Sequence, residues 1–266
     1  MKTILITGAS DGLGRALAEA LAESGHRLLL HGRNPERLKS VAEATGGEVF
    51  RADLSSLAAT KRLAAAIAAG HDRLDVLVNN AGVGFRKAST ERQTSIDGYE
   101  LRLAVNYLAP VLLTRELLPL LKKAAPSRIV NVASMGQQMF DFEDPQFERG
   151  FSQLDAYCRS KLALVTHTVG LAEELAGTGV TVNSLHPATF MATAMTHASG
   201  VDVKEPVEKG VAATSRLVSD PELATVTGRF YNGESETPPP HSEALAPPYR
   251  RRLADLTDEL LKLASV

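Results

Sequence analysis

The chain has 266 residues, of which 44% are hydrophobic and 23% are charged, and its formal net charge is −2. This length suits one large α/β domain with a substantial core and is short for two domains. The near-neutral charge gives no electrostatic reason to expect a nucleic acid or an anionic membrane surface as a partner. Cys158 is the only cysteine, so an internal disulfide is excluded and a reducing compartment is the simpler expectation.

Short apolar runs alternate with longer stretches rich in alanine and leucine along most of the chain. Continuous apolar strands separated by helices are typical of a parallel sheet with helices on both faces. No repeat or linker divides the chain, so we predict one doubly wound, mostly parallel α/β domain over residues 1–266. The predicted strands are Thr3–Thr7, Arg27–His31, Glu48–Ala52, Val76–Asn79, Arg128–Val132 and Val180–Leu185. The predicted helices are Leu13–Glu23, Pro35–Ala44, Leu57–Ala68, Glu100–Lys123, Asp155–Leu175 and Tyr249–Leu263.

The first predicted strand starts almost at the N-terminus. Its apolar run is too short for a signal peptide or a membrane span. We therefore expect a cytoplasmic protein without a membrane span.

A glycine-rich turn, Thr7–Gly14, joins the first strand to the first helix. Glycines at such a turn let backbone amides approach a pyrophosphate, and the helix N-terminus adds partial positive charge. The spacing is G-x3-G-x-G rather than G-x-G-x-x-G, but the order of strand, turn and helix is the confirming one. The same residues also spell the G-x-S-x-G of a hydrolase nucleophile elbow, which needs strands before the serine, and only one precedes it here. The turn predicts cofactor contacts at Gly8, Ser10, Asp11, Gly12, Leu13 and Gly14.

The second strand ends in His31-Gly32-Arg33-Asn34. An acidic residue near this point would bond the ribose hydroxyl of NAD and repel a 2′-phosphate. Arg33 instead offers a guanidinium that suits a phosphate, which favours NADP and leaves NAD as the alternative. Asp11 opposes this preference, because a carboxylate near a phosphate pocket is unfavourable.

Tyr157 and Lys161 project from one face of a predicted helix, because residues i and i+4 stack above one another. A nearby positive charge favours the phenolate and lowers a tyrosine pKa. Bringing that pKa from about 10 to about 7 needs roughly 4 kcal/mol, which is more than one exposed lysine supplies. A second positive charge is needed, and an oxidised nicotinamide ring can provide it.

Taken in order, these motifs resemble the short-chain dehydrogenase/reductase family over nearly the whole chain. The motifs are Gly8–Gly14, Asp53-Leu54, Asn79-Asn80-Ala81-Gly82, Asn106, Ser134, Tyr157 and Lys161. A finer resemblance is to the retinol-dehydrogenase-like branch, which includes the WW-domain oxidoreductases. It depends on Asp97–Leu101, on Gly177–Pro187 and on the long interval between Ser134 and Tyr157.

The resemblance implies a Rossmann-type fold and a role for each matching residue. Ser134 would bond the substrate oxygen, and Tyr157 would act as general acid and base. Lys161 would bond the nicotinamide ribose and lower the Tyr157 pKa, and Asn106 would hold a water that links Lys161 to solvent. Asp53 and Leu54 would contact the adenine. The remaining implied cofactor contacts are Asn80, Ala81, Gly82, Tyr157, Lys161, Pro187 and Thr189.

One position departs from the family pattern. Ala188 stands where the family often has a glycine, and alanine resists positive φ, so the turn after the sixth strand is expected to be reshaped. Thr193 is a second candidate for the contact assigned to Thr189.

The substrate is expected to lie between the segments 83–87, 136–153 and 190–208, with the Pro-rich segment 236–248 partly closing the pocket. Their aromatic and thioether side chains favour an apolar ligand, and the resemblance adds lipophilic alcohols, aldehydes and ketones. These side chains are Phe85, Met139, Phe140, Phe142, Phe190, Met191 and Met195. The seven histidines show no ligand spacing, so no metal is predicted.

The sequence therefore predicts an NADP(H)-dependent oxidoreductase that transfers hydride between nicotinamide and a small-molecule carbonyl or alcohol. The alternative is a catalytically silent protein that binds NADPH and reports it to a partner. A nucleotide-sugar epimerase or dehydratase is disfavoured, because little chain is left after Leu185 for a substrate domain. Pairing through the two long helices would give a homodimer or homotetramer, unless the C-terminal segment blocks that face.

Overall fold

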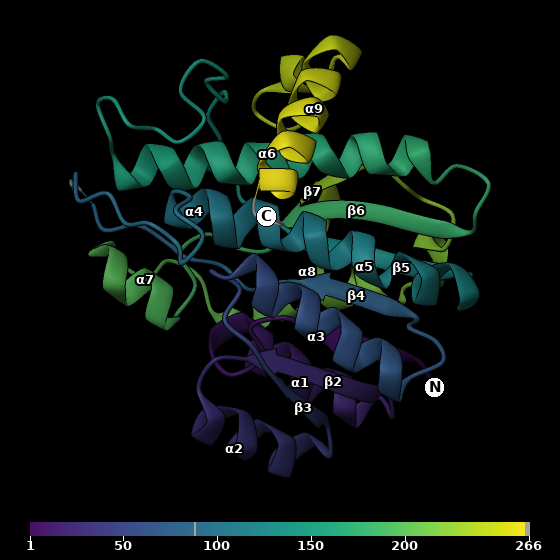
Figure 1. The fold of residues 1–266 in the computed structure, drawn as a ribbon. Coiled ribbons are helices and arrows are strands. Elements are labelled where there is room, and N and C mark those ends of the chain that lie inside the picture. The colour runs from purple at the N-terminus through teal and green to yellow at the C-terminus, as the bar shows by residue number, and fades with distance from the viewer. Residues whose placement is uncertain (88, 264–266) are drawn as a thin grey trace.

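The computed structural model describes residues 1–87 and 89–263, and its described part contains one eight-stranded sheet (Figure 1). The strand order is β3-β2-β1-β4-β5-β6-β7-β8, and only the last pair is antiparallel. The order reverses between β1 and β4, the switch point at which doubly wound sheets bind ligands. The predicted fold class is confirmed. The strands are β1 (Thr3–Ile6), β2 (Arg27–Gly32), β3 (Glu48–Arg51), β4 (Val76–Asn79), β5 (Ser127–Val132), β6 (Val180–His186), β7 (Phe230–Asn232) and β8 (Ser235–Glu236).

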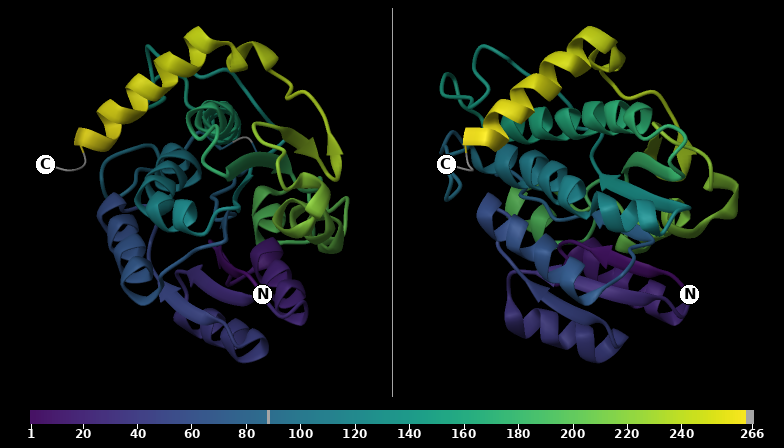
Figure 2. Two further views of the ribbon diagram at one scale, coloured as in Figure 1. Left: turned by 90° about the vertical axis from the view of Figure 1, so that its right-hand side faces the viewer. Right: turned by 45° about the vertical axis from the view of Figure 1, so that its right-hand side comes forward.

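Helices flank both faces of the sheet, as the left-hand view of Figure 2 shows. Side chains of successive strand residues point to opposite faces. Accordingly, Ile4 and Ile6 belong to the core under one group of helices, and Leu5 belongs to the core under the other. The first group is α1 (Gly12–Glu23), α2 (Pro35–Thr45) and α8 (Val207–Ser219). The second group is α3 (Leu57–Gly70), α5 (Ala109–Lys123) and α6 (Gln153–Glu174).

The predicted helix Glu100–Lys123 is interrupted by a wider turn. It consists of α4 (Leu101–Leu103), a π-helical segment (Ala104–Leu108) and α5. Such π segments often mark functional sites, and this one contains Asn106.

The stretch Leu101–Lys123 is also the one helical stretch in the described part that has the length and apolar composition to cross a membrane. The mean hydropathy of an 18-residue window in this stretch is 1.2, and 72% of that window is buried within the protein. It lies against the sheet, as a core helix does.

The C-terminal helix α9 (Pro247–Leu263) lies across α6 and docks on the core as predicted (Figure 1). Leu253 and Leu260 are buried against it, and Leu256 is partly buried; the side chain of Leu263 lies outside the described residues. The Thr257 hydroxyl is 2.6 Å from the Tyr107 hydroxyl, so a polar contact joins α9 to the π segment.

Several elements were not predicted. The segment 190–208, for which no helix was predicted, contains α7 (Ala194–Ser199) and the start of α8. The segment 136–152, also without a predicted element, is irregular up to the start of α6. The buried face of α8 includes Gly210 and Thr214, which weaken an apolar signal, and β7 and β8 are too short to show a periodicity. Short 3-10 turns occupy Pro221–Leu223 and Ser242–Leu245.

Candidate active site

The glycine turn is shaped by close contacts that side chains would prevent. Gly8 and Gly12 have φ of +68° and +51°, and a Cβ on Gly14 would lie 2.8 Å from the Gly8 carbonyl carbon. Real Cβ atoms essentially never approach so closely. The turn therefore needs glycine at these positions, and it leaves bare backbone at the N-terminus of α1, where a pyrophosphate can bind.

A cavity of about 1570 Å³ runs along the carboxyl ends of the strands from this turn. It is larger than the 300–1,000 Å³ typical of pockets for one small ligand, so a dinucleotide and a second molecule fit together. All the predicted cofactor-binding residues line it, and so do three of the four predicted catalytic residues. The fourth, Asn106, is fully buried behind the wall.

The adenosine end of the cavity is organised by His31, which the sequence analysis did not single out. Its Nδ1 is 3.4 Å from the Gly8 nitrogen and its Nε2 is 3.2 Å from the Ala52 carbonyl oxygen. Burial lowers the pKa of His31 to about 4, so the ring is neutral at pH 7. A neutral imidazole has one acceptor and one donor, which match these two partners. His31 thereby ties the glycine turn to Ala52, which lies between the end of β3 and Asp53.

The Ser134 and Tyr157 hydroxyls meet on the wall of the cavity. Ser134 Oγ accepts a hydrogen bond from the Gly136 amide at 3.0 Å, and a Cβ on Gly136 would lie 3.5 Å from Ser134 Oγ and 3.9 Å from Tyr157 Cε1, so the two side chains are neighbours. The Phe85 ring packs at 5.3 Å from the Tyr157 ring, centroid to centroid. Burial raises the pKa of Tyr157, and the nearby Ser134 side chain only partly offsets this effect.

Lys161 lies beside Tyr157 on α6, as its spacing predicts. Its Nζ is 5.7 Å from the centre of the Tyr157 ring and donates to the Val132 carbonyl oxygen at 2.8 Å. Burial lowers the pKa of Lys161 to about 8. Burial is the largest influence on the Tyr157 pKa, and the lowering of that pKa by Lys161 together with a nicotinamide ring stays a prediction.

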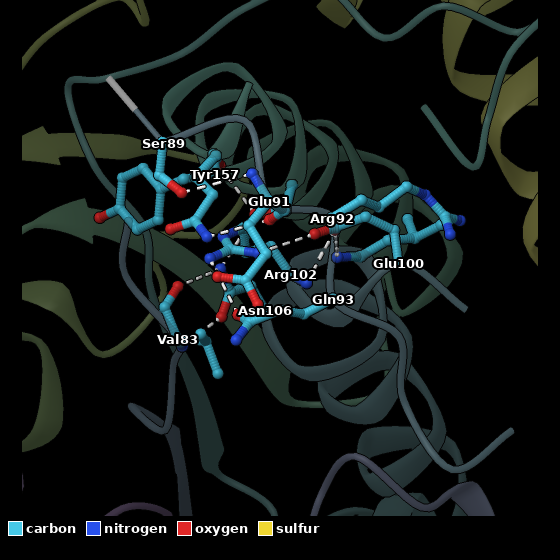
Figure 3. A network of polar contacts seen from close by, with 12 residues as sticks. Val83, Ser89, Glu91, Arg92, Gln93, Glu100, Arg102, Asn106 and Tyr157 are labelled. Carbon is cyan, nitrogen blue, oxygen red and sulfur yellow. Dashed lines mark hydrogen bonds and ion pairs between the residues drawn. The ribbon is translucent and has the colours of Figure 1, made fainter. Parts of the chain in front are cut away.

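Asn106 fastens the end of β4 to α6. Its side chain accepts from the Val83 amide at 2.7 Å, and donates to the Val83 carbonyl and to Ser160 Oγ, each at 3.0 Å (Figure 3). A Cβ on Gly82 would lie 3.3 Å from Asn106 Oδ1 and 3.6 Å from Lys161 Nζ. The side chains of Asn106 and Lys161 thus both lie next to the Gly82 backbone. The water relay through Asn106 stays a prediction.

A buried ion pair supports the same loop one helical turn earlier. Arg102 donates to the Gly84 carbonyl at 2.9 Å and to Glu100 at 3.0 Å, and both charged side chains are 2% exposed (Figure 3). Glu100 also accepts from the Arg102 and Leu103 amides. Asn106 and Arg102 therefore fix the loop at Val83 and Gly84 in place. The motifs did not predict this role for Arg102.

The turn after β6 has its positive φ two residues after Ala188, and a reshaping relative to the family stays a prediction. Phe190, rather than Ala188, has a positive φ of +45°. The Thr189 hydroxyl is 3.1 Å from His186 Nε2 and the Thr189 amide donates to Glu205, whereas Thr193 caps α7. Both threonines line the cavity, and neither is favoured by the geometry alone.

Helix α7 closes over the substrate end of the cavity. A Cβ on Gly84 would lie 2.6 Å from Met195 Cγ, and the Lys87 amide donates to the Ser199 carbonyl at 3.0 Å. Figure 1 shows α7 beside the segment that leads into α4. Within residues 1–87 and 89–263, no group of histidine, cysteine and carboxylate side chains is placed to hold a metal ion.

The family model for short chain dehydrogenases matches residues 2–204. The chain belongs to the short-chain dehydrogenase family. It is therefore an oxidoreductase that acts on CH–OH groups, in a family that uses NAD(P).

Similarity to individual members places the chain in the retinol-dehydrogenase-like branch of short-chain dehydrogenases. It is 35% identical to Retinol dehydrogenase 13 from Homo sapiens, over 91% of this chain and 80% of that protein. The Pseudomonas aeruginosa RhlG/NADP active-site complex is 30% identical with a TM-score of 0.72, over 87% of this chain and 94% of that one. The 3-ketoacyl-(acyl-carrier-protein) reductase from Brucella melitensis, complexed with NADH, is 25% identical with a TM-score of 0.71, over 87% and 96%.

Proposed function

We propose that the protein is an NADP(H)-dependent oxidoreductase that interconverts a lipophilic alcohol and its aldehyde or ketone. The observation that carries this proposal is the contact between the Ser134 and Tyr157 hydroxyls, with Lys161 beside them, on the wall of the cavity that begins at the glycine turn. The bare backbone at Gly8, Gly12 and Gly14 fits a dinucleotide pyrophosphate.

Bound NADP(H) supplies or accepts the hydride. The residues of the chain bind, orient and handle the proton. Ser134 holds the substrate oxygen next to the Tyr157 hydroxyl, which gives that oxygen a proton during reduction and removes it during oxidation. Lys161 holds the nicotinamide ribose, and Asn106 keeps the loop at Val83 in place behind it. Orientation and proton transfer account for the protein's share of the chemistry.

The lining of the cavity near Tyr157 supports an apolar substrate. Phe85, Phe190 and Met195 line it, in agreement with the sequence prediction. Phe140 and Phe142 do not, because they pack with Tyr249 under α9. The printed name of the human relative supports retinol or a similar alcohol as the substrate class. No observation favours the alternative of a silent NADPH-binding protein.

The substrate class is tested by following NADPH and NADH absorbance with all-trans-retinal, decanal and cyclohexanone. NADPH is expected to be oxidised faster with retinal and decanal than with cyclohexanone, and faster than NADH is with the same two aldehydes. Tight NADPH binding without oxidation by any carbonyl would instead support the silent binding protein.

Arg33→Ala is expected to weaken NADP⁺ binding by roughly ten- to hundredfold, because a hydrogen bond between charged groups is worth about 1.5–3 kcal/mol. NAD⁺ affinity should stay within about twofold, since NAD⁺ lacks the 2′-phosphate. Titration calorimetry with both cofactors measures this. Arg27→Ala is the matched control, because Arg27 is an exposed arginine at the opposite end of the same strand. An equal loss of both cofactors would refute the assignment of Arg33 to the phosphate.

A further inference from the structure

A carboxylate lies among the arginines at the adenosine end of the cavity. Asp11 Oδ2 pairs with Arg37 Nη1 at 2.7 Å, and Asp11, Arg33 and Arg37 all line the cavity. Arg51 lies close by, because its Nε donates to the Arg33 carbonyl at 3.2 Å. Arginines therefore gather at this end of the cavity, and Asp11 is the carboxylate paired with one of them.

The local backbone fixes this ion pair in place. Asp11 is the N-cap of α1, and its other carboxylate oxygen accepts from the Gly12 amide at 2.7 Å. Arg37 lies in the first turn of α2, where its amide donates to the Asn34 side chain at 2.9 Å. The pair therefore joins the N-terminal ends of α1 and α2, two helices on the same face of the sheet.

We propose that Asp11 is a counter-ion that limits the selectivity of the site for NADP over NAD. This inference depends on the proposed assignment of Arg33 to the 2′-phosphate. Arg37 is the second cation of that phosphate site, and Asp11 competes for it and repels the incoming phosphate. When NAD is bound instead, Asp11 remains paired with Arg37.

Moving Arg37 from Asp11 to a phosphate costs little free energy, as expected if Asp11 adjusts the selectivity of the site. Both side chains are about half exposed, at 59% for Arg37 and 47% for Asp11. Ion pairs this exposed contribute little to stability, because water and salt screen them. Arg37 can leave Asp11 for a phosphate, to which guanidinium binds in a bidentate manner. Asp11 then lies beside the phosphate and interacts more weakly with Arg37.

Asp11→Asn tests this proposal, because asparagine caps a helix as well as aspartate does and removes only the charge. We expect the ratio of the NAD⁺ to the NADP⁺ dissociation constant to rise by up to about fivefold, the size of one screened surface charge interaction. Titration calorimetry with NADP⁺, NAD⁺, 2′,5′-ADP and 5′-AMP measures it without turnover. Asp11→Asn should bind 2′,5′-ADP more tightly than the wild-type protein does and should bind 5′-AMP equally well.

Glu19→Gln is the matched control, since Glu19 is an exposed carboxylate that pairs with Arg15 on the same helix, outside the cavity. It should leave the ratio unchanged. An unchanged or lower ratio in Asp11→Asn would overturn the counter-ion proposal, even if the wild-type protein prefers NADP⁺. If Arg33→Ala instead binds NADP⁺ as tightly as the wild-type protein, the proposed cofactor preference is overturned. The two failures are therefore distinguishable.

Discussion

Tyr157→Phe is expected to lower turnover by about 10²–10⁴-fold, the size of a general acid–base contribution. The ring and its packing against Phe85 remain, so the fold and the cofactor affinity should be unchanged. Only the hydroxyl that meets Ser134 is lost. Steady-state kinetics with the best carbonyl substrate, together with calorimetric binding of NADPH, separates the two effects.

Tyr231→Phe is the matched control for this substitution. The Tyr231 hydroxyl is buried in β7 and has no hydrogen-bond partner in the described part of the chain, and Tyr231 does not line the cavity. It should therefore retain wild-type turnover. If Tyr157→Phe kept wild-type turnover as well, Tyr157 would have no part in the mechanism.

Gly14→Ala is expected to weaken the binding of both cofactors by roughly ten- to hundredfold, because overpacking of about 1–3 kcal/mol would displace the turn. The added methyl group would clash with the Gly8 backbone and lie 2.6 Å from the Asn80 amide nitrogen. Asn80 itself bonds the Thr7 carbonyl at 2.8 Å, so it cannot retreat without cost. Calorimetry with NADP⁺ and NAD⁺ measures the loss.

Gly170→Ala provides the comparison for that variant. Gly170 is in α6, and a Cβ there would meet nothing within 4 Å. Alanine should stabilise the helix by about 1 kcal/mol without changing cofactor affinity. Wild-type affinity in Gly14→Ala would contradict the assignment of the turn to the pyrophosphate.

The architecture could be predicted because its signals are local and repeated. Ile4, Leu5 and Ile6 are all buried, which gives the continuous apolar run of a strand covered on both faces. Helix α8 escaped prediction because its contact with α1 uses small residues; a Cβ on Gly210 would lie 3.2 Å from Leu13 Cδ1. Its place in the fold depends on a distant surface that no local pattern contains.

The site residues could be predicted as a set because their order along the chain matches the motifs of the family. The glycine turn and Ser134 follow strands, whereas Asn106, Tyr157 and Lys161 lie on helical segments. The energetics of that set could not be predicted. The burial that raises the Tyr157 pKa, and the Val132 carbonyl that holds Lys161, both depend on tertiary packing. The supporting roles of His31 and Arg102 were missed for the same reason, because their partners are backbone groups far along the chain.

The most direct test of the account is the ionisation of Tyr157, followed by ultraviolet difference absorbance between the wild-type protein and Tyr157→Phe. Without cofactor, burial should keep the pKa above about 10, so the two proteins should titrate alike up to that pH. Saturating NADP⁺ should bring the second positive charge and produce one additional phenolate in the wild-type protein below about pH 9. Identical titrations through pH 9, with NADP⁺ shown to be bound, would contradict a phenol tuned by lysine and nicotinamide.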